Sequence, residues 1–219
     1  MFLLQNISEL LHTLIYVLPA VILCLSVHEF AHAFVAYRLG DESQRFRGRL
    51  SLNPLRHLDI MGTICLIIAG FGWAKPVQID PSYFKNAKNG MMWSALAGPL
   101  SNFVLAFIAL LCYWFLLKIG FYPDNAIAEY LYTLLTYIAI LSAGLGIFNM
   151  LPLPPLDGSK ILLGILNEET YFKIMRYERY LGLILMLLLI SGSLDTILVM
   201  LRSGFINICN EMIWMLLGI

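Results

Sequence analysis

The sequence predicts an all-α polytopic membrane protein, on three observations. Of its 219 residues, 60% are hydrophobic and only 13% are charged, whereas soluble domains carry about 25% charged residues. Several apolar stretches reach the roughly 20 residues that cross a bilayer. Breaks that contain glycine or proline interrupt these stretches. We therefore expect four to five transmembrane helices, one re-entrant element and one helix broken by prolines, within a single domain of residues 1–219.

Four stretches are long enough to span the membrane, and the tail is open to two interpretations. The predicted spans are residues 10–37, 91–117, 130–148 and 180–201. The tail, residues 205–219, is short and contains Glu211, so it is either a last span or a helix in the interface. The N-terminus lacks the basic start of a cleavable signal peptide.

Residues 60–74 are apolar but too short to cross, which favours a re-entrant element. They contain three glycines and several β-branched residues. A β-hairpin is therefore one possible structure of this element. Basic residues precede and follow the element. If it dips into the membrane and returns, both basic flanks face the cytoplasm, as the positive-inside rule requires.

The same rule orients the rest of the chain in the cell membrane. The first span ends inside at Arg38, and the loop 120–130 has no Lys or Arg and is expected outside. The formal net charge is zero, so no nucleic-acid partner is predicted. The four scattered cysteines show no metal or redox spacing and are expected to be buried apolar residues.

Ionisable groups inside the first span predict a metal site. His28 and His32 are four residues apart, so on a helix they lie on one face, one turn from each other. Glu29 is placed to reach a water on the same metal without being a ligand. This HExxH pattern is that of zinc hydrolases. The alternative is that the histidines are buried and bonded to the helix backbone or to each other.

A third ligand is expected at Asp157, because catalytic zinc sites have three protein ligands. It follows the prolines 152, 154 and 155, which break a helix at membrane depth, where irregular backbone is tolerated only beside a cavity. His28 lies ten residues before Arg38, and Asp157 lies ten residues before Asn167, where each stretch becomes polar. Ten residues are roughly 15 Å of helix, so both groups are expected at a similar depth. The alternative for Asp157 is a plain helix cap.

At this point the sequence resembles the site-2 proteases, zinc metalloproteases that work inside membranes. The family's HExxH appears at residues 28–32, and its Asn–Pro–Asp-Gly signature appears at Asn149, the prolines and Asp157-Gly158. The stretches "GRLSLNPLRHLD", "GFGWAKP" and "ALAGPLSN" are similar to those of short bacterial members without PDZ or CBS domains. The resemblance implies Zn²⁺ bound by His28, His32 and Asp157, with Glu29 as general base and Asn149 holding the substrate or the oxyanion.

Other polar residues have weaker patterns. His57 and Asp59 are either members of a solvated basic loop, the favoured interpretation, or groups near the site. Ser94, Gly98 and Asn102 recur every four residues, a spacing typical of close helix packing. Asn102 reaches the site only if that face of its helix points inward.

The sequence therefore predicts an intramembrane zinc endopeptidase whose active site lies toward the cytoplasmic side. Its partners would be the lipid bilayer and a membrane protein with a transmembrane helix. We expect that helix to unwind at the cleaved bond and to add as a strand to the edge of residues 60–74. The oligomeric state and the substrate's identity stay open. The alternatives are a catalytically silent membrane adaptor of the same fold, which the intact motif disfavours, and a metal transporter, which would need a polar path across the membrane.

Overall fold

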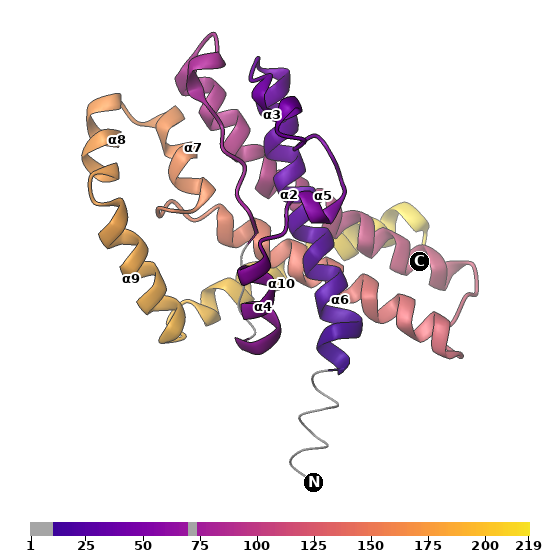
Figure 1. Cartoon of the computed structure of the whole chain (residues 1–219). Helices are drawn as coiled ribbons and strands as arrows, with labels where there is room; N and C mark the ends of the chain where they lie inside the picture. Colours follow the sequence, from indigo (N-terminus) through magenta and orange to yellow (C-terminus); the bar gives the residue numbers. More distant parts are fainter. Residues whose placement is uncertain (1–10, 70–73) are drawn as a thin grey trace.

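The computed structural model describes residues 11–69 and 74–219, and this part of the chain is helical, with no strand (Figure 1). In chain order the elements are η1 (Thr13–Val17), α2 (Leu18–Arg38), α3 (Ser43–Phe46), η2 (Pro54–Arg56), α4 (Ile60–Ala69), η3 (Pro81–Tyr83), α5 (Ala87–Lys118), α6 (Ala126–Asn149), α7 (Asp157–Ile165), α8 (Glu168–Met175), α9 (Glu178–Ile190) and α10 (Asp195–Leu217). Four helical stretches of the described part are long and apolar enough to cross a membrane: Leu14–Arg38, α5, α6 and α10. The predicted class, an all-α polytopic membrane protein, is confirmed.

Helix α5 is the centre of the fold. It packs against α2, α6, α7 and α10. Small side chains fill much of the core where α2, α5, α6 and α10 meet, and they allow the helices to approach closely. The buried members of this core are Ala20, Cys24, Ala109, Leu110, Ile138, Ala139, Cys209 and Ile213. Any group that α2 and α7 present to each other is therefore held in place by α5.

The re-entrant element is a helix over most of its length, so the expectation of a β-hairpin is wrong there. Residues 60–69 form α4, and residues 70–73 lie outside the described part. Ten helical residues span about 15 Å, half of a bilayer core. The two ends of the element meet, because Leu58 pairs with Ala74 and the Lys75 N–H donates to the His57 carbonyl at 2.7 Å. A segment whose ends are paired returns to the side from which it left.

The strand edge expected within residues 60–74 is not found in residues 60–69, since these residues form α4. A short apolar run has no periodicity that separates a buried helix from a strand. The β-branched residues favoured a strand, whereas a ten-residue helix satisfies its own backbone hydrogen bonds, which an open strand edge in lipid cannot do.

The fourth span was predicted with the wrong boundaries. Residues 180–201 do not form one helix, because α9 ends at Ile190 and α10 begins at Asp195. Gly192 lies between them with φ +69°, a conformation that glycine adopts without steric cost. The 13 residues of α9 span about 20 Å, less than a bilayer core. The spanning helix is instead α10, which includes most of the tail.

The proline-broken helix is confirmed. α6 ends at Asn149 and α7 begins at Asp157, and the residues between them are irregular. Pro154 and Pro155 have no N–H group, so they cannot continue the hydrogen-bond ladder of α6. The break turns the chain so that α7 packs on α5, and it places Asp157 at the first turn of the new helix.

The paired ends of the re-entrant element predict that both flanks face the same side of the membrane. Single cysteines replacing Arg56 and Lys85, in a protein without its native cysteines, should react with an impermeant maleimide from one side only, and from the same side. A cysteine replacing Asp124, in the loop between α5 and α6, is the control and should react from the opposite side. Labelling of Arg56→Cys and Lys85→Cys from opposite sides would contradict the re-entrant geometry.

Candidate metal centre

Two buried histidines of α2 face each other. His28 and His32 are 4% and 6% exposed, and one helical turn separates them. Their Nε2 atoms are 3.0 Å apart, and the ring planes are nearly perpendicular, at 88°. The spacing read from the sequence therefore does bring the two imidazoles to one point.

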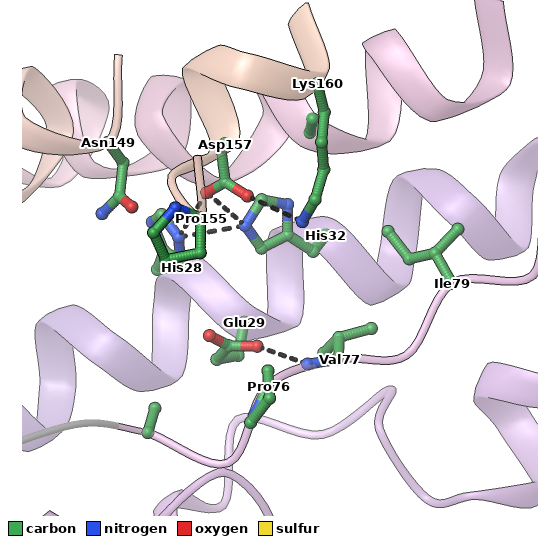
Figure 2. A pocket seen from close by; sticks show the side chains of 12 residues that line it. His28, Glu29, His32, Pro76, Val77, Ile79, Asn149, Pro155, Asp157 and Lys160 are labelled. Carbon is green, nitrogen blue, oxygen red and sulfur yellow. Dashed lines mark hydrogen bonds and ion pairs between the residues drawn. The ribbon is translucent and has the colours of Figure 1, made fainter. Parts of the chain in front are cut away.

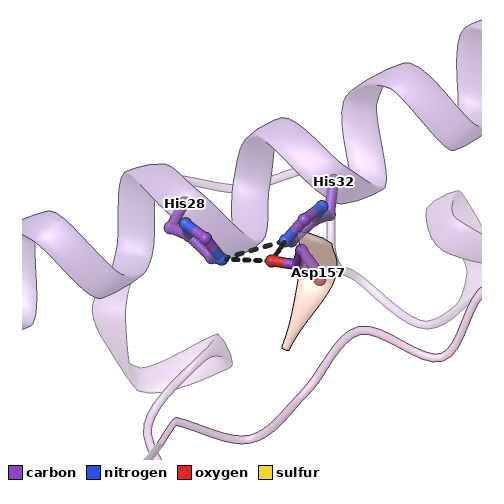
Figure 3. Close-up of side chains that lie close together, drawn as sticks. All are labelled: His28, His32 and Asp157. Atoms are coloured by element: carbon purple, nitrogen blue, oxygen red, sulfur yellow. Dashed lines mark hydrogen bonds and ion pairs between the residues drawn. The ribbon is translucent and has the colours of Figure 1, made fainter. Parts of the chain in front are cut away.

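Asp157 joins them from the break between α6 and α7 (Figure 3). Its Oδ2 lies 3.1 Å from His28 Nε2 and 3.0 Å from His32 Nε2. The cap interpretation does not hold, because Asp157 follows the N-cap residue Leu156 and no side-chain cap hydrogen bond forms at this end of α7. Three potential ligands thus meet within the protein, from chain positions more than 120 residues apart.

The tautomer of His32 is set by α5. His32 Nδ1 lies 2.6 Å from the backbone carbonyl of Ser94, and a carbonyl oxygen only accepts hydrogen bonds. Nδ1 therefore carries the proton, and in the neutral ring Nε2 presents a lone pair to His28 and Asp157. This backbone partner on the far nitrogen is the usual second contact of a metal-binding histidine.

His28 has a partner on α5 as well. The side chain of Asn102 is fully buried, and its Nδ2 lies 3.0 Å from His28 Nδ1. The other amide atom, Oδ1, has no partner within the described residues. A half turn of the carboxamide brings Oδ1 to His28 Nδ1, where it accepts the Nδ1 proton and leaves the lone pair on Nε2. The inward face of α5, which the sequence left open, thus reaches the site.

The two nitrogens and the carboxylate oxygen have the spacing of ligands on one ion. Their ligand atoms all lie within 4.8 Å of one another, and the three closest pairs are at 3.0–3.1 Å. Tetrahedral ligands at the bond lengths of zinc are separated by about 3.3 Å. With both Nδ1 atoms protonated, the two Nε2 lone pairs and the Asp157 oxygen are three acceptors that face each other without a donor. They repel each other, and a bound cation removes this repulsion.

Glu29 lies opposite the three groups, across the cavity (Figure 2). It is 8% exposed, and its Oε2 accepts a hydrogen bond of 2.9 Å from the backbone N–H of Val77. This bond holds the carboxylate in place, and Oε1 has no hydrogen-bond partner among the described residues. Val77 belongs to the segment that follows the re-entrant element, so this segment forms one wall of the site.

The site opens into a cavity of about 370 Å³. Asn149 and Lys160 line it together with the four groups above. The Asn149 amide donates to the Leu145 carbonyl at 3.0 Å, which leaves its side-chain oxygen available. Lys160 Nζ lies 3.5 Å from Asp157 Oδ1, the oxygen that does not face the histidines. Lys160 was not identified as a site residue from the sequence. Its position three residues after Asp157, about one helical turn, could have indicated that the two side chains lie close together.

Gly98 explains how α5 comes so close to the imidazoles. A Cβ atom at this position would lie 2.3 Å from His32 Nε2 and 2.7 Å from His28 Cε1. The small residues of α5 were expected to serve helix packing in general, whereas Gly98 packs on the two rings themselves.

His57 and Asp59 are outside the site. His57 is fully buried, and its Nε2 lies 2.6 Å from the Ser51 carbonyl, so it is not a solvated loop residue as favoured from the sequence. Asp59 accepts from the Gly62 N–H at the start of α4. Both stabilise the turn that leads into the re-entrant element.

Comparison with known proteins identifies the family. Residues 117–190, which include Asn149, the prolines and Asp157, match peptidase family M50. A Bacillus subtilis protein named "Putative zinc metalloprotease YwhC" is 37% identical over 194 residues, 86% of this chain and 87% of that protein. The chain belongs to peptidase family M50. Its recognition as a member of the site-2 protease family is thereby confirmed.

Further relatives of this M50 chain occur in other bacteria and in archaea. "Putative zinc metalloprotease Rip2" of Mycolicibacterium smegmatis is 33% identical over 186 residues, 83% of this chain and 69% of that protein. "Putative zinc metalloprotease MJ0611" of Methanocaldococcus jannaschii is 34% identical over 141 residues, 62% of each chain. No solved structure gives a significant match.

Gly98→Ala should disrupt the metal centre without unfolding the protein. The added methyl group displaces both rings, an overpacking that costs about 1–3 kcal/mol. Gly204→Ala on α10 is the matched control, because nothing lies within 4 Å of a Cβ at that position. We expect reduced metal content by elemental analysis in Gly98→Ala and unchanged content in Gly204→Ala. Equal metal content in both variants would mean that the rings tolerate the methyl group.

Asn102→Leu should weaken metal binding, because His28 loses the acceptor of its Nδ1 proton. Loss of such a partner lowers metal affinity about 10- to 100-fold. Asn102→Asp keeps an acceptor at the same place and should retain most of the affinity. Competition with a chelator of known affinity measures both variants. If Asn102→Asp is as weak as Asn102→Leu, the carboxamide has only a packing role.

Proposed function

We propose that the protein is an intramembrane zinc endopeptidase that hydrolyses a peptide bond in or near a transmembrane segment of another membrane protein. The observation that carries the proposal is the meeting of His28, His32 and Asp157 at 3.0–3.1 Å inside a membrane-embedded bundle. Membership of peptidase family M50 and the names of the relatives support the metal as zinc and the reaction as proteolysis.

A zinc ion held by these three residues would act as a Lewis acid toward the scissile carbonyl and the attacking water. Glu29 is the general base. Its free Oε1 takes a proton from the water as the water oxygen bonds to the carbonyl carbon. The resulting carboxylic acid then returns the proton to the leaving nitrogen as the C–N bond breaks. The Val77 N–H bond keeps Glu29 oriented through both transfers.

Asn149 and Lys160 are the groups available for the substrate. The Asn149 oxygen can accept from a substrate N–H, which binds the chain beside the cavity. Lys160 brings a positive charge next to Asp157, and 38% of the Lys160 side chain is exposed. Lys160 lines the cavity, where the carbonyl oxygen of a bound substrate would become negative during the reaction. Such preorganised charge stabilises the transition state.

Substrate access and orientation follow from the setting of the site. The cavity is lined by the first turn of α7 and by the segment 74–79. The segment 74–79 is not helical, and α7 begins only at Asp157. A helical substrate must unwind there, because its peptide bonds are otherwise hidden by their own hydrogen bonds. The basic flanks of the re-entrant element support the cytoplasmic side of the cell membrane for this end of the bundle, by the positive-inside rule.

Three variants separate the enzyme from a silent adaptor. Glu29→Gln keeps the shape of the side chain but cannot accept a proton, so zinc should stay bound while cleavage falls by a factor of at least about 100. Asp157→Ala and His28→Ala remove ligands, so zinc content and cleavage should both fall. Zinc is measured by elemental analysis and cleavage by gel electrophoresis of a transmembrane substrate.

Glu169→Gln is the matched control for Glu29→Gln, because Glu169 is exposed and its one ion pair among the described residues is with Lys173. It should cleave at the wild-type rate. Wild-type cleavage by Glu29→Gln would remove Glu29 as the base. Absence of cleavage in the wild-type protein together with full zinc content would favour the adaptor. Full zinc content in Asp157→Ala would exclude Asp157 as a ligand.

A further inference from the structure

Arg49 is a buried cation with no counter-ion in the described part of the chain. Only 8% of the residue is exposed. Its guanidinium donates to the carbonyls of Arg56 and Lys75 at 2.8 and 3.1 Å and to that of Pro76 at 3.4 Å. No carboxylate of the described residues lies within ion-pair distance of it. Buried charges in proteins are normally paired, so this site has the polarity to receive an anion.

A separate cavity opens beside Arg49. Its volume is about 340 Å³, and its lining consists of Arg47, Arg49, Lys75, Pro76 and Gln78. Three of these five residues are cations and none is an acid. One Arg47 nitrogen donates to the Gln78 carbonyl at 2.9 Å and lies 3.5 Å from the Gln78 side-chain oxygen. Among the described residues the other guanidinium nitrogens of Arg47 have no hydrogen-bond partner. The volume lies within the range of small-molecule sites.

The neighbouring carboxylates are already engaged. Asp80 accepts from the N–H and the hydroxyl of Ser82 at 2.9 and 2.6 Å; these bonds, with a smaller contribution from Arg47, lower its pKa. Asp41 is fully buried and accepts from the Gln44 amide and the Ser43 N–H. Neither forms an ion pair with the cations of the cavity within the described residues. Asp80 is near enough to Arg47 to act on it electrostatically, but the lining of the cavity itself holds three cations and no acid.

Apolar side chains project from the same loop. Phe46, Leu52 and Leu55 are 84%, 59% and 79% exposed, and they lie in the same 11-residue stretch as Arg47, Arg49 and Arg56. The loop follows directly after α2, which is part of a membrane-spanning stretch that ends at Arg38. Exposed apolar residues next to cations, at the end of a span, are the composition of a surface that rests on lipid headgroups.

We propose that this cavity binds the phosphate group of an anionic phospholipid. The phosphate would lie between Arg47, Arg49 and Lys75, and the acyl chains would continue beside the exposed apolar side chains of the loop. The charge of the buried Arg49 would then be balanced by the lipid. A free phosphate ion offers the same charge but has no acyl chains for the apolar side chains to contact.

The cavity shares a wall with the metal centre. Pro76 lines both cavities, and the next residue, Val77, donates to Glu29. A lipid phosphate bound to Lys75 would thus hold the segment that orients Glu29. The binding itself does not depend on the proposed proteolysis, and it can be measured on Glu29→Gln protein that does not turn over.

The test is lipid binding by the purified full-length Glu29→Gln protein, measured by native mass spectrometry with added phosphatidylglycerol. Arg47→Gln combined with Lys75→Gln should lower the affinity by about tenfold or more, since each surface cation contributes about 1 kcal/mol toward anionic lipid. Arg49 stays in place because its carbonyl contacts support the loop. Arg176→Gln combined with Arg179→Gln removes the same charge from exposed positions elsewhere and should bind as well as the parent.

Three arms distinguish the ligands. Phosphatidylcholine should bind more weakly than phosphatidylglycerol, and inorganic phosphate should not displace the lipid. Equal affinity of the parent and both double variants, with unchanged thermal unfolding, would overturn the site. Displacement by inorganic phosphate would overturn the lipid as its ligand. An acidic peptide that binds this cavity while phosphatidylglycerol does not would overturn the proposal in favour of a protein partner.

Discussion

The structure depends on one electrostatic constraint, which is that three hydrogen-bond acceptors face each other in a buried site. Once Asn102 turns its Oδ1 toward His28 Nδ1, His28 and His32 present lone pairs and Asp157 presents a carboxylate oxygen, all about 3 Å apart. In a medium of low dielectric constant this arrangement is unfavourable unless a cation occupies the centre. The helices on either side have to hold the three groups against that repulsion, and the packing of the whole bundle serves this purpose.

Helix α5 is the frame that holds them. Three of its residues, one turn apart, contact the site in different ways: the Ser94 carbonyl sets the tautomer of His32, the absent side chain of Gly98 makes room for both rings, and Asn102 contacts His28. A helix that packs against α2, α6 and α7 at once makes these contacts rigid. The second contact of each imidazole therefore comes from the backbone or side chain of one neighbouring helix.

The loop between α2 and α5 joins the membrane surface to the site. Arg49 ties the two flanks of the re-entrant element together through three carbonyls, and the same segment supplies the N–H group that holds Glu29. The basic residues of this loop differ in burial. Their number predicts the orientation of the chain in the membrane. The burial of Arg49 and the cavity beside it are local features that composition does not reveal.

The sequence by itself determined the class of the protein and brought its candidate metal ligands into view. Hydropathy predicted the spans, and helical spacing placed His28 and His32 together, because both follow from local periodicity. The position of Asp157 at the same depth came from counting residues to the polar boundary. Only the tertiary structure decided the contacts of α5 with the imidazoles, the helix at residues 60–69 and the division of residues 180–201. These depend on which faces meet and on how backbone groups are satisfied in lipid, and such long-range packing leaves no local pattern in the sequence.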